Sequence, residues 1–105
     1  MVNSFQIKYL SIAQKDLTEI IEYIMDDNPS AALEILDKMD TSISKLENFP
    51  YMGCVPKDTR LKHTGYRILI VDNYLVFYVV FAELKIVEIR RILHGRRHYN
   101  FLLET

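Results

Sequence analysis

The chain has 105 residues, half of them hydrophobic, with three glycines, three prolines and a formal net charge of −1. This length and composition predict one packed domain spanning residues 1–105 and exclude a disordered chain or a second core. The longest apolar run, Tyr74 to Ala82, is too short for a membrane helix, and the N-terminus has no signal-peptide pattern. The single cysteine, Cys54, fits a reducing compartment, so we expect a cytoplasmic protein without membrane contact.

The charges are unevenly distributed along the chain. Residues 1–56 carry a net charge of −5, whereas residues 57–105 carry +4. This asymmetry predicts one acidic surface and one basic surface, the second suited to an anionic partner. The alternative is that the two halves neutralise each other across the fold.

The first half of the sequence predicts a strand followed by two helices. Residues 5–10 alternate between apolar and polar side chains, which is typical of a short strand. Ser11 can then cap a helix whose apolar face is opposite Asp16, Glu19, Glu22 and Asp26; that face comprises Ala13, Leu17, Ile20, Ile21 and Ile24. Asn28 as N-cap and Pro29 at the first position begin a second helix, which Pro50 ends. The short joint between them predicts an antiparallel helical hairpin.

The second half predicts a loop and then a meander. Residues 49–65 contain two prolines, no periodicity and a basic second half, and they predict a long loop. Residues 66–72, 74–81 and 85–93 predict three strands joined by tight turns, and hence an antiparallel arrangement. A short helix can follow Gly95. The fold class is therefore α+β: an N-terminal strand and a two-helix hairpin packed on a mostly antiparallel sheet, with a short C-terminal segment.

Two predicted strands place arginines among apolar side chains. Arg67 shares a strand face with Leu69 and Val71, and Arg91 shares one with Val87, Ile89 and Leu93 and has no acid beside it. Arg90, by contrast, shares its face with Glu88, which can be its partner. An arginine on an apolar face is costly unless it is paired or lines a wet cleft. Arg67 and Arg91 therefore either line a functional cleft or are snorkelling side chains at strand ends.

Three stretches of the chain together resemble the RelE/ParE superfamily of bacterial toxins: LTEIIEYI (17–24), GYRILIVDNYLVFYVV (65–80) and VEIRRILHGRRHY (87–99). The resemblance covers nearly the whole chain and implies the fold described above. It also implies a type II toxin–antitoxin module, in which a protein antitoxin holds a small toxin inactive.

The resemblance implies two different targets. RelE-like members enter the ribosomal A site and cut mRNA, whereas ParE-like members inhibit DNA gyrase and are not known as nucleases. Arg67 and Arg96 match basic residues of the RelE branch by position, and His98–Tyr99 is similar to the His-Tyr end of YoeB-type relatives. Lys57, Arg60 and Lys62 are similar to the basic loop of RelE. The sequence pI of about 6.3 departs from the strongly basic RelE-type nucleases, and the His-Gly-Arg-Arg motif is frequent among ParE-like members as well.

Metal-free RNA cleavage needs a general base, a general acid and cations for the phosphate. His98 is the first acid–base candidate and His94 the second, while Tyr99 can stack on an unpaired base. The predicted catalytic residues are Arg67, Arg91, Arg96, His98 and Tyr99, and the predicted RNA- or target-binding residues are Lys57, Arg60, Lys62, His94 and Arg97. No spacing predicts a metal site or a phosphate-binding glycine loop, so we expect no metal and no cofactor. The sequence by itself favours ribosome-dependent mRNA cleavage, with gyrase inhibition as the alternative.

Overall fold

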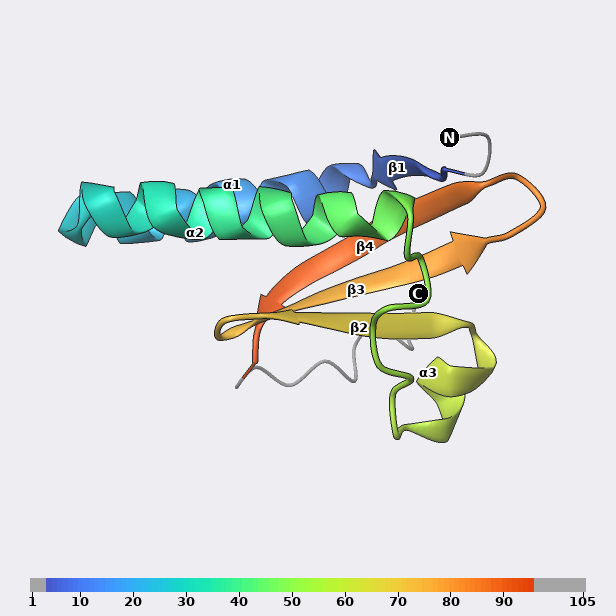
Figure 1. Cartoon of the computed structure of the whole chain (residues 1–105). Coiled ribbons are helices and arrows are strands. Elements are labelled where there is room, and N and C mark those ends of the chain that lie inside the picture. The colour runs from blue at the N-terminus through green and yellow to red at the C-terminus, as the bar shows by residue number, and fades with distance from the viewer. Residues whose placement is uncertain (1–3, 96–105) are drawn as a thin grey trace.

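The structure is a computed structural model that describes residues 4–95. These residues form a four-stranded sheet in the order β1-β4-β3-β2, and two antiparallel helices lie against it (Figure 1). The elements in chain order are β1 (Gln6–Tyr9), α1 (Ser11–Asp27), α2 (Pro29–Ser44), the 3-10 helix η1 (Lys45–Glu47), α3 (Thr59–His63), β2 (Tyr66–Val71), β3 (Tyr74–Phe81) and β4 (Ile86–His94). The predicted α+β fold class is confirmed.

The start of α2 matches its prediction, but two other helix ends do not. Asn28 caps α2, because its side-chain oxygen accepts a hydrogen bond from the Ala31 amide at 3.1 Å. Ser11 does not cap α1. It is already the first helical residue, since Leu10 is still bonded to β4 through its amide and the Ile89 carbonyl. The α-helical part of α2 ends at Ser44 rather than near Pro50, and the Glu47 carbonyl just beyond accepts the Phe5 amide ahead of β1.

The sheet combines the predicted meander with one parallel pair. β2 pairs with β3 and β3 pairs with β4, both antiparallel, whereas β1 pairs with β4 in parallel. Asp72 in the β2–β3 turn has a φ of 52°, a left-handed conformation that Asp tolerates better than most residues. The N-terminal strand thus closes one edge of the sheet, and β2 forms the other.

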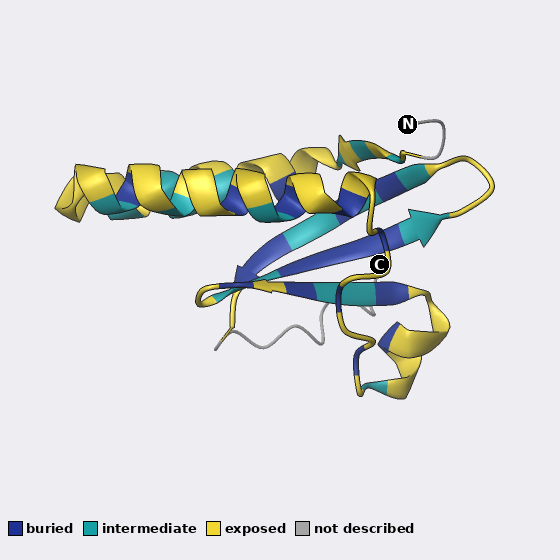
Figure 2. Ribbon diagram, in the orientation of Figure 1, coloured by how far each residue is buried: buried dark blue, intermediate teal, exposed yellow. Residues whose placement is uncertain are grey.

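Apolar side chains fill both faces of the sheet. On the helix-facing side, Met39 and Ile43 of α2 pack against Tyr78, Val87 and Ile89. On the opposite side, Leu61 of α3 packs against Tyr66, Phe77 and Leu93. Strands β3 and β4 are therefore buried or half-buried along most of their length, while the outer surface of the hairpin is largely exposed (Figure 2).

A β-bulge changes the predicted parity of β4. The register between β3 and β4 shifts between Phe77 and Tyr78, which oppose Arg91 and Ile89 and leave Arg90 as the extra residue. Beyond the bulge, Ile92 rather than Leu93 joins Val87 and Ile89 in the helix-facing core. The prediction that Leu93 shares a face with Val87 and Ile89 is wrong, because an inserted residue reverses the alternation.

Four further predictions concern the loop over residues 49–65, membrane spans, metal sites and a C-terminal helix. The long loop predicted over residues 49–65 is interrupted by α3. None of the helices between residues 4 and 95 has the length and apolar character that a membrane span requires. Within the same range, no cluster of His, Cys, Asp and Glu side chains is placed to hold a metal ion. The helix predicted after Gly95 lies outside the described residues.

Candidate functional site

Arg67 fastens the segment after α2 to the end of the sheet. Its side chain lies on the helix-facing side of β2, where Arg67 pairs with Tyr78 of β3. Its Nη2 donates hydrogen bonds to the carbonyls of Tyr51 (3.0 Å) and Gly53 (2.9 Å), and the guanidinium lies 5.4 Å from the centre of the Tyr51 ring. Its buried Nε has no hydrogen-bond partner among residues 4–95. Two backbone carbonyls therefore hold the guanidinium of the predicted catalytic arginine in place inside the fold.

Gly53 and Tyr78 complete this attachment. The Gly53 amide donates to the Tyr78 hydroxyl at 2.9 Å, and burial raises the pKa of Tyr78, which keeps that hydroxyl neutral. A Cβ at Gly53 would lie 2.6 Å from the Tyr78 Oη, so only glycine fits. Cys54 then pairs with Ile68 of β2 through two backbone hydrogen bonds of 2.8 Å. The segment is thus a fixed part of the molecule rather than a loose connection.

Apolar side chains point outward from this fixed segment. Phe49 is 64% exposed and Tyr51 is 54% exposed, and Met52 and Val55 are exposed as well. Residues 48–52 line a shallow hollow whose surface is almost entirely apolar. Exposed apolar groups held in one place are typical of a docking surface rather than of a solvated loop.

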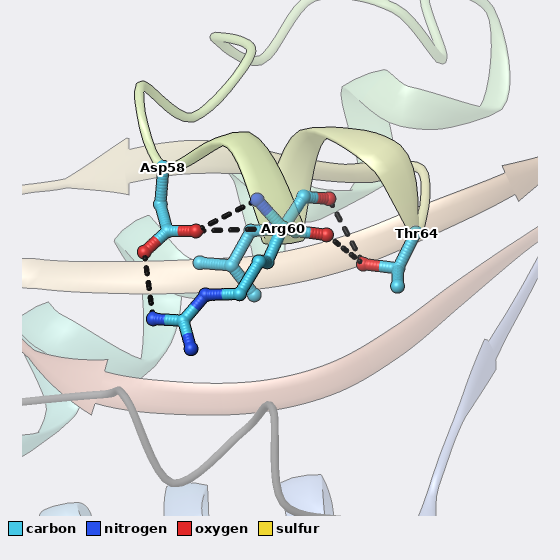
Figure 3. A network of polar contacts seen from close by, with 4 residues as sticks. Asp58, Arg60 and Thr64 are labelled. Atoms are coloured by element: carbon cyan, nitrogen blue, oxygen red, sulfur yellow. Dashed lines mark hydrogen bonds and ion pairs between the residues drawn. The ribbon is translucent and has the colours of Figure 1, made fainter.

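Helix α3 follows directly and carries cations (Figure 3). The Asp58 side chain accepts the amides of Arg60 (2.9 Å) and Leu61 (3.3 Å), and the Thr64 hydroxyl donates to the carbonyls of Arg60 (3.2 Å) and Leu61 (2.9 Å). Desolvation opposes ionisation of Asp58, but these amides and the Arg60 guanidinium lower its pKa overall. Lys57, Arg60 and Lys62 are exposed, so the predicted basic loop is a short, capped helix with its cations in solvent.

Arg91 has an acidic partner that the strand pattern did not indicate. Asp16 of α1 accepts hydrogen bonds from Arg91 Nε (2.7 Å), Arg91 Nη2 (2.9 Å) and the Ile92 amide (3.0 Å). The side chains of Arg91 and Asp16 are only 13% and 9% exposed, and the bond to Asp16 raises the pKa of Arg91. The predictions that Arg91 lacks an acid and that Asp16 lies on the polar face of α1 are wrong. The partner comes from another element, and β1 ends before it can occupy this edge of β4.

Arg90 behaves as predicted with respect to Glu88. Its Nε donates to Glu88 Oε1 at 2.8 Å, and its guanidinium also lies 5.5 Å from the centre of the Tyr66 ring. Since Tyr66 packs against Leu61, Arg90 lies near α3 on the sheet face opposite the hairpin. The alternation of β4 from Ile89 already places this cation on that face, together with Glu88.

His94 lies at a different end of the sheet from Arg67. It pairs with Tyr74, which pairs with Val71, four residues along β2 from Arg67 and roughly 13 Å away at the rise of a strand. His94 stacks edge-on against the Tyr74 ring and shares a pocket with Asp16 and Glu19. Asp16 is already neutralised by Arg91, so Glu19 is the acid in this pocket that disfavours an anionic substrate.

Comparison with family models identifies the family of this chain. Residues 7–99 match the family described as the ParE toxin of the type II toxin-antitoxin system, parDE. The chain belongs to the ParE toxin family. This family forms part of the RelE/ParE superfamily that the sequence resembles, and the predicted toxin of a type II system is confirmed.

Individual relatives of this ParE-family toxin are distant in sequence. It is 27% identical over 94 residues to "Putative toxin Y4kP" of Sinorhizobium fredii (strain NBRC 101917 / NGR234), covering 90% of this chain and 92% of that protein. The chromosomal ParDE system from P. aeruginosa contains a chain with a TM-score of 0.70 and 18% identity, covering 88% of this chain and 97% of that one. The RelBE2 toxin–antitoxin complex from Mycobacterium tuberculosis contains one with a TM-score of 0.62 and 18% identity, covering 87% and 98%. These structures support the fold.

In this ParE-family toxin the predicted site residues do not form one cluster. The segment between α2 and β2 contains Lys57, Arg60 and Lys62, and Arg67 of β2 is bonded to it. By contrast, Arg91 and His94 lie beside α1. Arg96, Arg97, His98 and Tyr99 lie outside the described residues, and their roles stay predictions. The exposed apolar residues after α2 were missed, although Phe49, Tyr51 and Met52 around Pro50 are a signal in the sequence.

Proposed function

We propose that this ParE-family toxin arrests growth by binding DNA gyrase as a non-enzymatic inhibitor. The supporting observation is that Arg67 and Arg91, two of the arginines expected at an RNA phosphate, bind Tyr51, Gly53 and Asp16 inside the fold. Asp16 neutralises the charge of Arg91, and backbone carbonyls hold Arg67 in place, so neither guanidinium is positioned to follow a developing charge. The family match and the near-neutral net charge point in the same direction.

Ribosome-dependent mRNA cleavage is the second candidate. His98 and Tyr99 favour it, because they add acid–base and stacking chemistry that a docking protein does not need. In this alternative Arg96 supplies the cation for the phosphate, and Arg67 and Arg91 hold the scaffold.

We also propose that a cognate antitoxin protein binds and silences this toxin. Its structural neighbours come from a toxin–antitoxin system and a toxin–antitoxin complex, which motivates the proposal. Expression of the chain alone in bacteria should stop growth, and co-expression of the neighbouring small open reading frame should restore it.

A supercoiling assay with purified toxin and an induction experiment in cells distinguish the two targets. Under the gyrase proposal, purified toxin inhibits supercoiling by gyrase, and induced cells show stalled replication and a DNA-damage response with intact mRNA. Codon-positioned mRNA cuts that disappear in His98→Ala would contradict it and establish the nuclease. Arg67→Ala is the matched structural variant, since it should lower stability under either mechanism.

A further inference from the structure

We propose that residues 49–62 form a docking surface for an acidic segment of the toxin's protein target. We call this the loop surface and define it by the exposed side chains of Phe49, Tyr51, Met52, Val55, Lys57, Arg60 and Lys62. It deepens the proposed function, because it rests on that function's requirement for a protein target.

The loop surface combines exposed apolar side chains with a restrained backbone. Phe49 and Tyr51 expose more than half of their surface around the shallow apolar hollow. Their backbone is nevertheless restrained, since the Phe49 amide donates to the Lys45 carbonyl and Met52 to Phe49. Arg67, Gly53 and Cys54 attach the rest of the segment to β2 and β3. A preorganised apolar surface loses little conformational entropy on binding, which favours affinity.

The charges of the loop surface favour an acidic partner. Between residues 49 and 62 the sequence has three cations (Lys57, Arg60 and Lys62) and a single acid, Asp58, whose side chain caps α3. The exposed apolar residues of the hairpin have the opposite setting: Leu33 and Leu36 share a hollow with Asp37 and Asp40. An acidic partner segment is therefore attracted to the loop surface and repelled by the hairpin.

The apolar hollow favours a protein over a nucleic acid as the occupant. The hollow offers almost no polar surface for a phosphate or sugar, whereas it can bury an aliphatic or aromatic side chain. Cations follow the hollow along the chain at Lys57, Arg60 and Lys62, which suits a segment that carries both apolar anchors and carboxylates.

Matched variants test the loop surface. Phe49→Ala removes an apolar anchor, and Leu84→Ala, at a similarly exposed leucine in the β3–β4 turn, is its control. Lys57→Glu reverses an exposed charge of the loop surface, and Lys15→Glu reverses an exposed charge on α1. Each full-length variant is assayed for growth arrest, for binding to purified gyrase at two salt concentrations, and for antitoxin binding as a control of folding.

We expect Phe49→Ala and Lys57→Glu to weaken gyrase binding about tenfold or more, as interface anchors do, and to relieve growth arrest. Lys57→Glu should also reduce the salt dependence of binding. The two controls should stay within about twofold of the wild type. Antitoxin binding should be retained throughout.

The outcomes separate this inference from the proposed function. Wild-type toxin that arrests growth without binding gyrase overturns the proposed function, but the loop surface survives if both loop variants then lose toxicity with mRNA intact. Loop variants that arrest growth as fully as the wild type overturn the loop surface, whichever the target. Loss of antitoxin binding with unchanged toxicity assigns the surface to the antitoxin and also overturns it.

Discussion

Two arginines that sequence parity places among apolar side chains are satisfied by different chemistry. Arg91 meets the carboxylate of Asp16 in a two-pronged ion pair, and Arg67 meets two backbone carbonyls. In both cases the partner comes from a segment remote in sequence. A charged side chain on an apolar strand face therefore needs a partner within the fold, and a catalytic role requires separate evidence.

A substitution of Asp16 tests most directly whether Arg91 has a structural role. In Asp16→Ala the guanidinium of Arg91 stays largely buried without its carboxylate, and the Ile92 amide loses its acceptor. We expect the free energy of unfolding to fall by about 3–5 kcal/mol, as for other broken buried ion pairs. Urea denaturation followed by circular dichroism measures it.

Glu88→Ala is the matched control for Asp16→Ala. It breaks the ion pair between Arg90 and Glu88, whose side chains are 31% and 25% exposed, respectively. The free energy of unfolding should therefore fall by no more than about 1 kcal/mol. Equal losses in the two variants would contradict the structural role given to Asp16.

At the scale of elements, sequence periodicity found the strands and the two long helices but missed α3 and the bulge in β4. The hairpin and the meander were predictable because each repeats its apolar pattern over many residues. Helix α3 has five residues and a single buried one, Leu61, so it shows no period. The bulge at Arg90 was equally invisible, since one extra residue leaves the composition of β4 unchanged. Asp16 did leave a signal: it lies three residues after Ala13 and four before Ile20, within the buried stripe.

The stability of α3 should depend on pH through its cap. The pKa of Asp58 is lowered from 3.8 in the folded chain, so its contribution is fully present above pH 3.8. It is lost as the pH falls through the lower, folded value, because the protonated carboxyl no longer attracts the amides of Arg60 and Leu61. In an NMR titration the shifts of these two amides should share a midpoint below pH 3.8.

Two comparisons make this titration specific. Asp58→Asn keeps an acceptor for the amides but removes the ionisable group, so the shared midpoint should disappear. The Ala31 amide, which Asn28 caps at the start of α2, should show no such midpoint in either protein. A midpoint at or above 3.8, or one that persists in Asp58→Asn, would refute the role assigned to the cap.

On the scale of the whole molecule, one sheet joins two separate apolar clusters. The hairpin covers one face and α3 covers the other, but both clusters include side chains of β2, β3 and β4. Consecutive residues of β3 belong to different clusters: Phe77 faces α3 and Tyr78 faces the hairpin. Neither cluster can therefore lose its strands without exposing the other.

This sharing predicts that the chain unfolds as one cooperative unit. The far-ultraviolet signal of the helices and the near-ultraviolet signal of the tyrosines should report a single coincident transition in urea. Met39→Ala on the hairpin side and Leu61→Ala on the α3 side each remove a buried side chain, and each should cost about 2–5 kcal/mol. Both signals should shift together in both variants. A helical transition that moves in Met39→Ala while the tyrosine transition stays in place would divide the chain into two units and contradict the single domain.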